Sequence, residues 1–353
     1  GGDGDTVIAF DNNRRYCRRE WLGEIAALAA TLQTRCEPRW LLLHDNTYRF
    51  SIGLFALFAA GKQVVLPPNA QPGTLAALDT LPLLSPDDGT VAAQQNPFAL
   101  PLLDSGALTL SVLTSGSTGA ARTICKPLHC FDNEIAALEQ LWGETLGEAA
   151  VFASVSHQHV YGLLFRLLWP LASGRPFAAT TEPYPESLVA AWRQHPRAVL
   201  VSSPALLARF PPAIDLAADS NRLAAVFSSG GLLPFAAAQE WQQRLGLLPV
   251  EILGSSETGG VGWRCQHTDN EAWQPLPAVD LQLQDDSVLA VQSPFTGDAG
   301  RVVMGDRAAL LPDGRFRLLG RADTIVKIGE KRLSLTAMEH ALAASALVNE
   351  ARV

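Results

Sequence analysis

The sequence lacks the basic excess that a nucleic-acid-binding protein needs. Its 27 lysines and arginines are outnumbered by 35 aspartates and glutamates, so the formal net charge is −8 at pH 7. A surface that neutralises phosphates needs the opposite balance. We therefore expect no nucleic-acid partner, and the arginines at positions 14, 15, 18 and 19 are interpreted as a solvated face.

Cysteine is also scarce, and long apolar runs are missing. The five cysteines are odd in number and show no metal-ligand spacing, which favours reduced thiols in a cytoplasmic protein. No apolar run reaches the length of a membrane span. The first residues, 1–5, lack the charged and apolar regions of a signal peptide. We expect a cytoplasmic protein without a membrane span.

Two common catalytic motifs are missing as well. No Gly-Lys-Ser/Thr ends a glycine-rich loop, which disfavours a Walker-type NTPase. No Gly-x-Ser-x-Gly elbow appears with Asp and His following it, which disfavours a serine hydrolase.

The most informative segment that is present follows the apolar run 107–112. It reads Thr-Ser-Gly-Ser-Thr-Gly, and its residues are Thr114, Ser115, Gly116, Ser117, Thr118 and Gly119. Its glycines let a backbone approach a ligand closely, while hydroxyls and N–H groups can bind phosphate oxygens. An ordinary loop of small polar residues is the alternative interpretation.

Alternation of strand and helix patterns predicts an α/β fold with largely parallel sheets covered by helices. Strands are predicted at residues 40–43, 64–66, 149–155, 198–202, 223–227 and 250–253. The predicted helices are one capped by Asn46 and ending at Gly61, one at 162–171 closed by Gly174, one from Pro204, and one at 234–245. Ligands in such sheets bind at the carboxyl ends of strands.

The pattern changes after about residue 262. Short apolar runs at 279–283, 287–292, 300–304, 308–311 and 315–319 are separated by turn signals. They predict a small antiparallel β region. A helical pattern headed by a serine follows at 334–344.

Four more polar, glycine-rich segments complete a recurring set. They are His-Val-Tyr-Gly-Leu at 159–163, Ser-Ser-Gly-Gly-Leu-Leu-Pro at 228–234, Leu-Gly-Ser-Ser-Glu-Thr-Gly at 253–259, and Gly305-Asp306 with the later run 320–327. In this order and spread, the chain resembles the adenylate-forming superfamily of acyl- and aryl-CoA synthetases and AMP-dependent ligases. The resemblance covers nearly the whole chain.

The resemblance implies a fold of two helix-flanked, largely parallel sheets in αβαβα layers, plus a small distorted antiparallel β-barrel. The large N-terminal domain would span residues 1–320, with its barrel-like part at about 262–320. Residues 321–353 would form the hinge and the start of a small α+β C-terminal domain.

The resemblance also implies a reaction. Its members join a carboxylate to ATP, with Mg²⁺, to give an acyl-adenylate and pyrophosphate. The acyl group then passes to a thiol, here CoA or a separate phosphopantetheinyl acyl carrier protein. The carboxylate is already ionised at neutral pH, with a pKa near about 4, so adenylation needs no protein base.

Residue roles follow from the match. Catalytic roles fall to Glu257, Ser256 and Arg122, with Lys126 either a solvated charge or a substitute phosphate ligand. Mg²⁺ would bind Glu257 and Thr118, since a hard cation suits such oxygens. The nucleotide would contact residues 114–119 and also Gly230, Gly231, Leu232, Leu253, Gly254, Ser255, Asp306 and Arg321. The substrate pocket would contain His159, Tyr161, Gly162, Ser203, Ser229 and Gly259, and Asp323 would lie in the hinge.

The sequence departs from the family pattern in three places. Ala121-Arg122 replaces the commoner Pro-Lys, and Leu253 stands where many relatives have a tyrosine. The family's catalytic lysine would lie beyond Val353, and Lys327 and Lys331 belong to the hinge-side segment. Either the sequence is truncated, which we favour, or the protein lacks this lid. A chain without that lysine is expected to bind ATP but to adenylate poorly.

The pocket segments are small and partly polar, which favours an aryl or short unsaturated carboxylate over a long fatty acid. A catalytically weak binding protein, acting as a sensor or a carrier-protein dock, is the alternative function.

Overall fold

The computed structural model describes residues 3–12, 14–67, 69–86, 99–115, 121–322, 325–328, 331–334 and 342. Its centre is a nine-stranded sheet in which β8, β9, β10, β11, β12 and β1 form parallel pairs, while β2, β13 and β14 are antiparallel additions. In spatial order the strands are β14 (Gln274–Pro275), β13 (Gly259–Arg264), β12 (Val250–Ser255), β11 (Leu223–Ser228), β10 (Ala198–Ser202), β8 (Ala150–Ala153), β9 (Phe177–Ala178), β1 (Val7–Phe10) and β2 (Arg15–Cys17).

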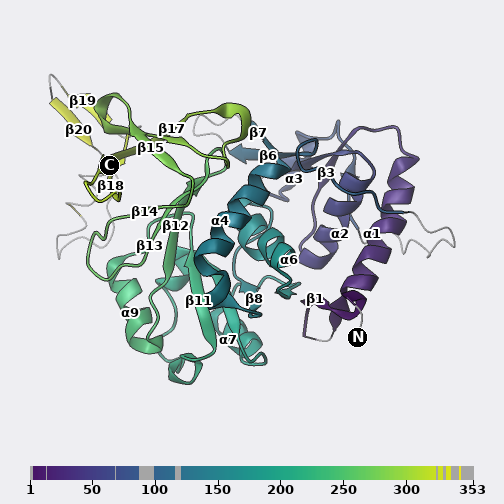
Figure 1. The fold of residues 1–353 in the computed structure, drawn as a ribbon, viewed down its shortest axis with the longest axis horizontal. Helices are drawn as coiled ribbons and strands as arrows, with labels where there is room; N and C mark the ends of the chain where they lie inside the picture. Colours follow the sequence, from purple (N-terminus) through teal and green to yellow (C-terminus); the bar gives the residue numbers. More distant parts are fainter. Residues whose placement is uncertain are drawn as a thin grey trace.

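The N-terminal part of the chain also forms a second, five-stranded sheet, which helices separate from β1 (Figure 1). Its order is β5 (Leu83–Leu84), β3 (Arg39–Leu42), β4 (Gln63–Leu66), β6 (Thr109–Ser115) and β7 (Ala121–Pro127). All pairs are parallel except the β6–β7 hairpin. The predicted strands of both sheets are thereby confirmed.

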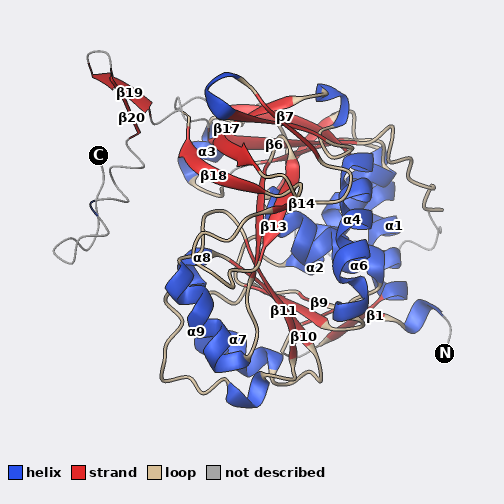
Figure 2. Ribbon diagram, turned by 60° about the vertical axis from the view of Figure 1, so that its left-hand side comes forward, coloured by secondary structure: helices blue, strands red, loops and turns tan. Residues whose placement is uncertain are grey.

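Helices cover the sheets in layers (Figure 2). They are α1 (Arg18–Gln33), α2 (Thr47–Ala59), α3 (Pro72–Ala76), α4 (Leu128–Leu146), α5 (Val160–Gly162), α6 (Trp169–Ser173), α7 (Pro185–Trp192), α8 (Pro204–Leu207) and α9 (Phe235–Leu245). A π-helix, Leu163–Leu168, joins α5 to α6.

Alternating residues of the central strands show that the nine-stranded sheet is buried on both faces. Val199 and Val201 of β10 belong to the core shared with α2, α4 and the second sheet, whereas Leu200 belongs to the core under α7 and α9. Because parallel sheets need helices on both faces, this pattern gives the predicted αβαβα layering. The α4 residue Trp142 packs edge-on against Phe227 in the layer between the sheets.

A four-stranded antiparallel sheet forms the curled, half-barrel part of the molecule. Its strands are β15 (Asp280–Leu283), β16 (Val288–Gln292), β17 (Val302–Leu310) and β18 (Phe316–Arg321). The predicted antiparallel region is confirmed, but the runs at 300–304 and 308–311, expected on either side of a turn, fall mostly within one strand, β17. In its pairing with β16, β17 has extra residues between Val303 and Arg307, so the strand continues past the Gly305-Asp306 pair as a bulge.

Beyond β18, the strands β19 (Ile325–Ile328) and β20 (Lys331–Ser334) pair as a hairpin that projects from the rest of the chain (Figure 2). The helix predicted at 334–344 falls, apart from its first residue and Leu342, outside the described residues.

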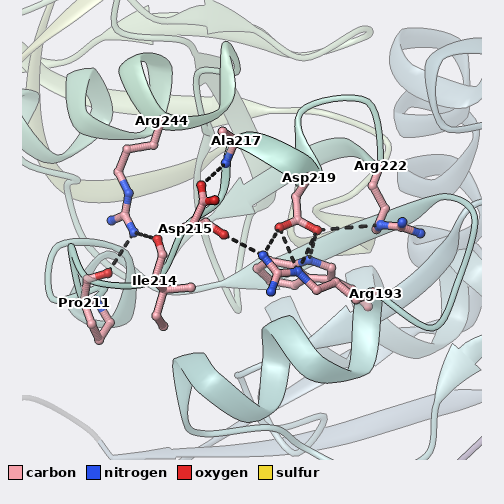
Figure 3. Close-up of polar contacts among 9 residues, drawn as sticks. Arg193, Pro211, Ile214, Asp215, Ala217, Asp219, Arg222 and Arg244 are labelled. Atoms are coloured by element: carbon pink, nitrogen blue, oxygen red, sulfur yellow. Dashed lines mark hydrogen bonds and ion pairs between the residues drawn. The ribbon is translucent and has the colours of Figure 1, made fainter.

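Arginines fasten the long loop between β10 and β11 (Figure 3). Arg244 donates to the carbonyl oxygens of Pro211 and Ile214, at 2.8 and 2.7 Å. The carboxylate of Asp219, which is 1% exposed, receives hydrogen bonds from Arg193. Since a buried carboxylate is costly without partners, these contacts are structural. They fix the loop that leads into β11.

The cap of α2 gives the first prediction. The Asn46 side chain accepts a hydrogen bond from the Arg49 N–H at 3.0 Å, so Asn46→Ala should lower the free energy of unfolding by about 1 kcal/mol in urea titrations. Asn46→Asp keeps the acceptor and serves as the control. Equal stability of the alanine variant and the unaltered protein would contradict this role.

Candidate active site

A cavity of about 180 Å³ lies at the carboxyl ends of the central strands, where an α/β sheet is expected to bind its ligand. Its wall combines apolar side chains with small, polar backbone segments. The lining residues are Glu134, His159, Val160, Tyr161, Leu164, Phe165, Ser229, Gly230, Ile252, Gly254, Ser255, Ser256, Gly259 and Gly260. The cavity is smaller than the roughly 300–1,000 Å³ of drug-sized pockets, which suits a compact ligand.

The turn between β12 and β13 carries the polar end of this wall. Ser255 and Thr258 hold it closed, because each backbone N–H donates to the other's hydroxyl at 3.1 Å. The turn places Ser256 at the cavity and leaves the carboxylate of Glu257 exposed to solvent. An exposed carboxylate beside a small-residue turn is suited to meet a polyphosphate with its cation.

Close backbone packing explains the glycines of this hairpin. A Cβ at Gly254 would lie 2.4 Å from the carbonyl oxygen of Gly259, which no real contact allows. Gly259 itself has a φ of +69°, which disfavours other residues. Positions 254 and 259 must therefore be glycine for β12 and β13 to pack this closely.

A buried ion pair positions the glycine-rich loop after β11. Glu251, 1% exposed, accepts hydrogen bonds from Arg264 Nε at 2.7 Å and from the Leu233 N–H at 2.8 Å. Gln266 Nε2 also donates to Glu251, at 2.7 Å, and to the Leu233 carbonyl. These contacts tie residues 228–233 to β12. Sequence reasoning missed Glu251, because its burial is not visible in the motif.

The apolar side of the cavity comes from the helix after residue 159. His159 is exposed at the N-terminus of α5, while Tyr161, Leu164 and Phe165 face inward. Burial raises the pKa of Tyr161 well above its usual value, so the phenol stays neutral. π-Helical turns such as Leu163–Leu168 often occur at functional sites.

His157 has a structural role. Its Nε2 donates to the His44 carbonyl at 2.7 Å, and its Nδ1 accepts from the Thr47 hydroxyl at 3.0 Å. Burial lowers the pKa of His157 to about 3, so the ring stays neutral.

The structure brings eight of the predicted site residues to the cavity wall. They are His159, Tyr161, Ser229, Gly230, Gly254, Ser255, Ser256 and Gly259. Glu257 follows them directly in the turn.

Five predicted residues lie elsewhere. Gly231 and the 52% exposed Leu232 belong to the loop after β11, and Ser203 precedes α8. Leu253 packs against the half-barrel core and is not among the residues that line the cavity. Gly162 is needed for packing, because a Cβ there would lie 2.0 Å from the Ser156 carbonyl oxygen.

The predicted ribose pair is close together in space. Asp306 of β17 lies opposite Arg321 of β18 in the ladder, and the nearest guanidinium nitrogen is 3.7 Å from the carboxylate. Gly305 leaves room for this arginine, since a Cβ there would lie 2.5 Å from its Nη2.

The predicted phosphate loop falls largely outside the described residues. Thr114 and Ser115 end β6, and Arg122 lies near the start of β7, with Thr114 opposite Arg122 in the register. Gly116, Ser117, Thr118 and Gly119 lie outside the description, as does Asp323.

The structure excludes one of the two interpretations of Lys126, that of a solvated surface charge. Its side chain is 3% exposed, so it is not a solvated charge, and its ammonium lies 5.5 Å from the centre of the Phe131 ring. The nearby Glu134, which no sequence pattern singled out, lines the cavity and is 2% exposed.

A single carboxylate is the donor set that Mg²⁺ usually receives from a nucleotide-binding protein, the rest coming from phosphates and water. Across the described ranges, no group of three or more His, Cys, Asp or Glu side chains gathers as a metal site. The exposed Glu257 therefore fits a cation that arrives with its nucleotide.

Solved structures with this architecture are adenylate-forming enzymes. The ATP-bound MatB from Rhodopseudomonas palustris superimposes with a TM-score of 0.80 over 97% of this chain and 81% of its own, at 16% identity. The amide bond synthetase McbA from Marinactinospora thermotolerans gives a TM-score of 0.80 over 99% and 83%, at 19% identity. These likenesses establish the fold class.

Sequence comparisons then identify the family. The AMP-binding enzyme family model matches residues 68–309, more than half of the chain. The chain belongs to the AMP-binding enzyme family. A 4-coumarate–CoA ligase from Cereibacter sphaeroides is 26% identical over 68% of this chain and 55% of its own length. A benzoate–CoA ligase from Thauera aromatica is 25% identical over 68% and 51%.

The chain thus spans about half the length of the curated relatives it matches. In the part of the chain that the structure covers, no helix combines the length and apolarity needed to cross a membrane.

Gly162 gives a test of the packing around the cavity. Gly162→Ala should destabilise the protein by about 1–3 kcal/mol, because the added methyl overlaps a backbone carbonyl. Gly23→Ala is the matched control: Gly23 is also helical, but nothing lies within 4 Å of its Cβ position, so alanine should stabilise by up to about 1 kcal/mol. Urea denaturation of both variants measures the difference, and equal effects would refute the packing explanation.

Proposed function

We propose that this chain carries the site for ATP-dependent activation of a small carboxylic acid to an acyl-adenylate, with release of pyrophosphate. The acid is an aryl or short unsaturated acid, and the acyl group then passes to the thiol of CoA or of an acyl carrier protein. The observation that carries the proposal is one cavity that joins an apolar wall to the Gly254–Ser256 turn, directly before Glu257.

The size and lining of the cavity support a compact acid. Tyr161, Leu164, Phe165 and Ile252 offer apolar and aromatic surface, and a cavity of about 180 Å³ suits a compact acid better than a long alkyl chain. The relatives from Cereibacter sphaeroides and Thauera aromatica are named for coumarate and benzoate, both aryl acids.

The chemistry requires alignment more than acid–base catalysis. A carboxylate oxygen attacks the α-phosphorus of ATP, a new oxygen–phosphorus bond forms, and the bond to pyrophosphate breaks. The attacking group is ionised at neutral pH, so no side chain has to remove a proton. Holding two anions in line and neutralising the charge that develops supplies the rate enhancement.

Each element of the site has a share in this task. The Ser256 hydroxyl, at the cavity wall, would donate to the α-phosphate. Asp306 would accept hydrogen bonds from the ribose hydroxyls, with Arg321 orienting it. The apolar wall excludes water from the reacting carboxylate. Glu257 would hold Mg²⁺, which supplies positive charge to the phosphate oxygens when bound.

A pyrophosphate-release screen of carboxylic acids on the full-length protein tests the proposal. Aryl and short unsaturated acids should give ATP-dependent release, and long fatty acids should not. ATP binding by calorimetry, with no release for any acid, would favour the sensor or carrier-dock alternative.

Glu257 should be needed for the magnesium-dependent step. Glu257→Gln should lower pyrophosphate release about tenfold or more, because a neutral amide is a poor ligand for a hard cation. Binding of AMP without Mg²⁺ should stay unchanged. Equal release by the variant and the unaltered protein would remove Glu257 from the reaction.

Asp306 should be needed for the nucleotide. Asp306→Asn should weaken AMP binding about tenfold, because hydrogen bonds to a charged group are the stronger ones. Asp313→Asn, an exposed change in the turn between β17 and β18, is the control and should bind AMP normally. Calorimetry at fixed salt measures both, and equal affinities would contradict the ribose role.

A further inference from the structure

Two buried ionisable groups from different parts of the fold lie beside Gly259 of the cavity wall, and one of them, Glu134, lines the cavity itself. Glu134 comes from α4, between the sheets, and Lys126 comes from β7 of the five-stranded sheet. Their exposed fractions are 2% and 3%, respectively. Residues of these types are almost never fully buried unless they are paired, so their position calls for a physical reason.

Only half of the Glu134 carboxylate has a structural partner. Its Oε1 accepts a hydrogen bond from the Gly260 N–H at 2.6 Å, which fastens α4 to the start of β13. Its Oε2 has no hydrogen-bonding partner among the described residues. The fastening contact therefore leaves a strong acceptor beside the cavity that Glu134 lines.

Lys126 is in the same situation. Its Nζ also lacks a hydrogen-bonding partner within the described part of the chain. Both atoms border the Cα of Gly259: a Cβ there would lie 2.6 Å from Glu134 Oε2 and 3.1 Å from Lys126 Nζ. A glycine at this position keeps open the space between the two groups.

A free buried acceptor is costly, because it has lost water without gaining a partner. Burial raises the pKa of Glu134, and the nearby Lys126 charge and the Gly260 N–H oppose that rise. A ligand in the cavity that donates a hydrogen bond to the Glu134 carboxylate would offset this unfavourable desolvation free energy. An apolar ligand would leave the Glu134 carboxylate unpaired. A ligand with a second carboxylate of its own would place that negative charge beside the charge of Glu134.

We propose that Glu134 is a specificity-determining residue that accepts a hydrogen bond from a hydroxyl group on the acyl substrate, with Lys126 holding its carboxylate in place. The proposal rests on the proposed function, because the acyl group must occupy this cavity. It narrows the substrate class to hydroxylated aryl or short unsaturated acids. A site built to bind a hydroxyl rejects the analogue that lacks it far better than an apolar pocket rejects an added group.

The test is the affinity of the full-length protein for stable acyl sulfamoyl adenosines, measured by calorimetry. The acyl groups are benzoyl, 3-hydroxybenzoyl, 4-hydroxybenzoyl and 4-methoxybenzoyl. At least one hydroxybenzoyl compound should bind about tenfold or more tightly than benzoyl. The methoxy compound should lose that advantage, because an ether oxygen has no hydrogen to donate.

Glu134→Gln should reduce the preference for hydroxybenzoyl to within about threefold, because the amide can satisfy Gly260 only by turning a donor toward the cavity. Glu144→Gln is the matched control: it is the same change on the same helix at an exposed position, and the preference should persist. Circular dichroism checks that each variant is folded. If Glu134→Gln does not fold, the methoxy comparison on the unaltered protein decides by itself.

Three outcomes would overturn the proposal, and the first two concern the benzoyl compounds. They are equal binding of benzoyl and both hydroxybenzoyl compounds, or an undiminished preference in folded Glu134→Gln. Tighter binding of a malonyl sulfamoyl adenosine than of every benzoyl compound would also overturn it, in favour of a dicarboxylate. Failure of all the compounds to bind would instead count against the proposed function itself.

Discussion

The β12–β13 hairpin is the constraint on which the site depends. Its glycines allow the two strands to come closer than any Cβ would permit. A hydrogen bond from the Gly260 N–H to buried Glu134 then fixes it against α4, at 2.6 Å. At the other end of β12, Glu251 and Arg264 form a buried pair. The turn that carries Ser256 and Glu257 is thus held at both ends, so its groups are oriented before any ligand arrives.

The same hairpin joins the separate cores of the fold. Trp263 of β13 packs on Trp142 of α4, with ring centres 5.5 Å apart, while Val261 belongs to the half-barrel core. A rearrangement of α4 would therefore move the cavity wall and the half-barrel together. For the proposed adenylate formation, a reaction that depends on alignment, these rigid elements would give the site the precision it needs.

Sequence patterns predicted the parallel strands, the N-cap of α2 at Asn46 and the end of α6 at Gly174, since these features depend on local periodicity and turn chemistry. They missed α4, which begins at Leu128 after Pro127 without a side-chain cap. Glu134 was therefore not considered as a site residue. The motifs located the cavity residues His159, Tyr161 and Ser256, but motif position does not reveal burial or backbone contact. For example, no motif reveals that a Cβ at Gly162 would overlap the Ser156 carbonyl oxygen.

The central claim is that the ligand carboxylate attacks ATP at the α-phosphorus in this cavity, and isotope transfer tests it most directly. A carboxylic acid labelled with ¹⁸O in its carboxylate is incubated with ATP, Mg²⁺, hydroxylamine and the full-length protein, and the AMP is examined by mass spectrometry. Because the acyl carbon–oxygen bond breaks when hydroxylamine accepts the acyl group, AMP should carry one ¹⁸O. Unlabelled AMP, or ADP in its place, would contradict the account.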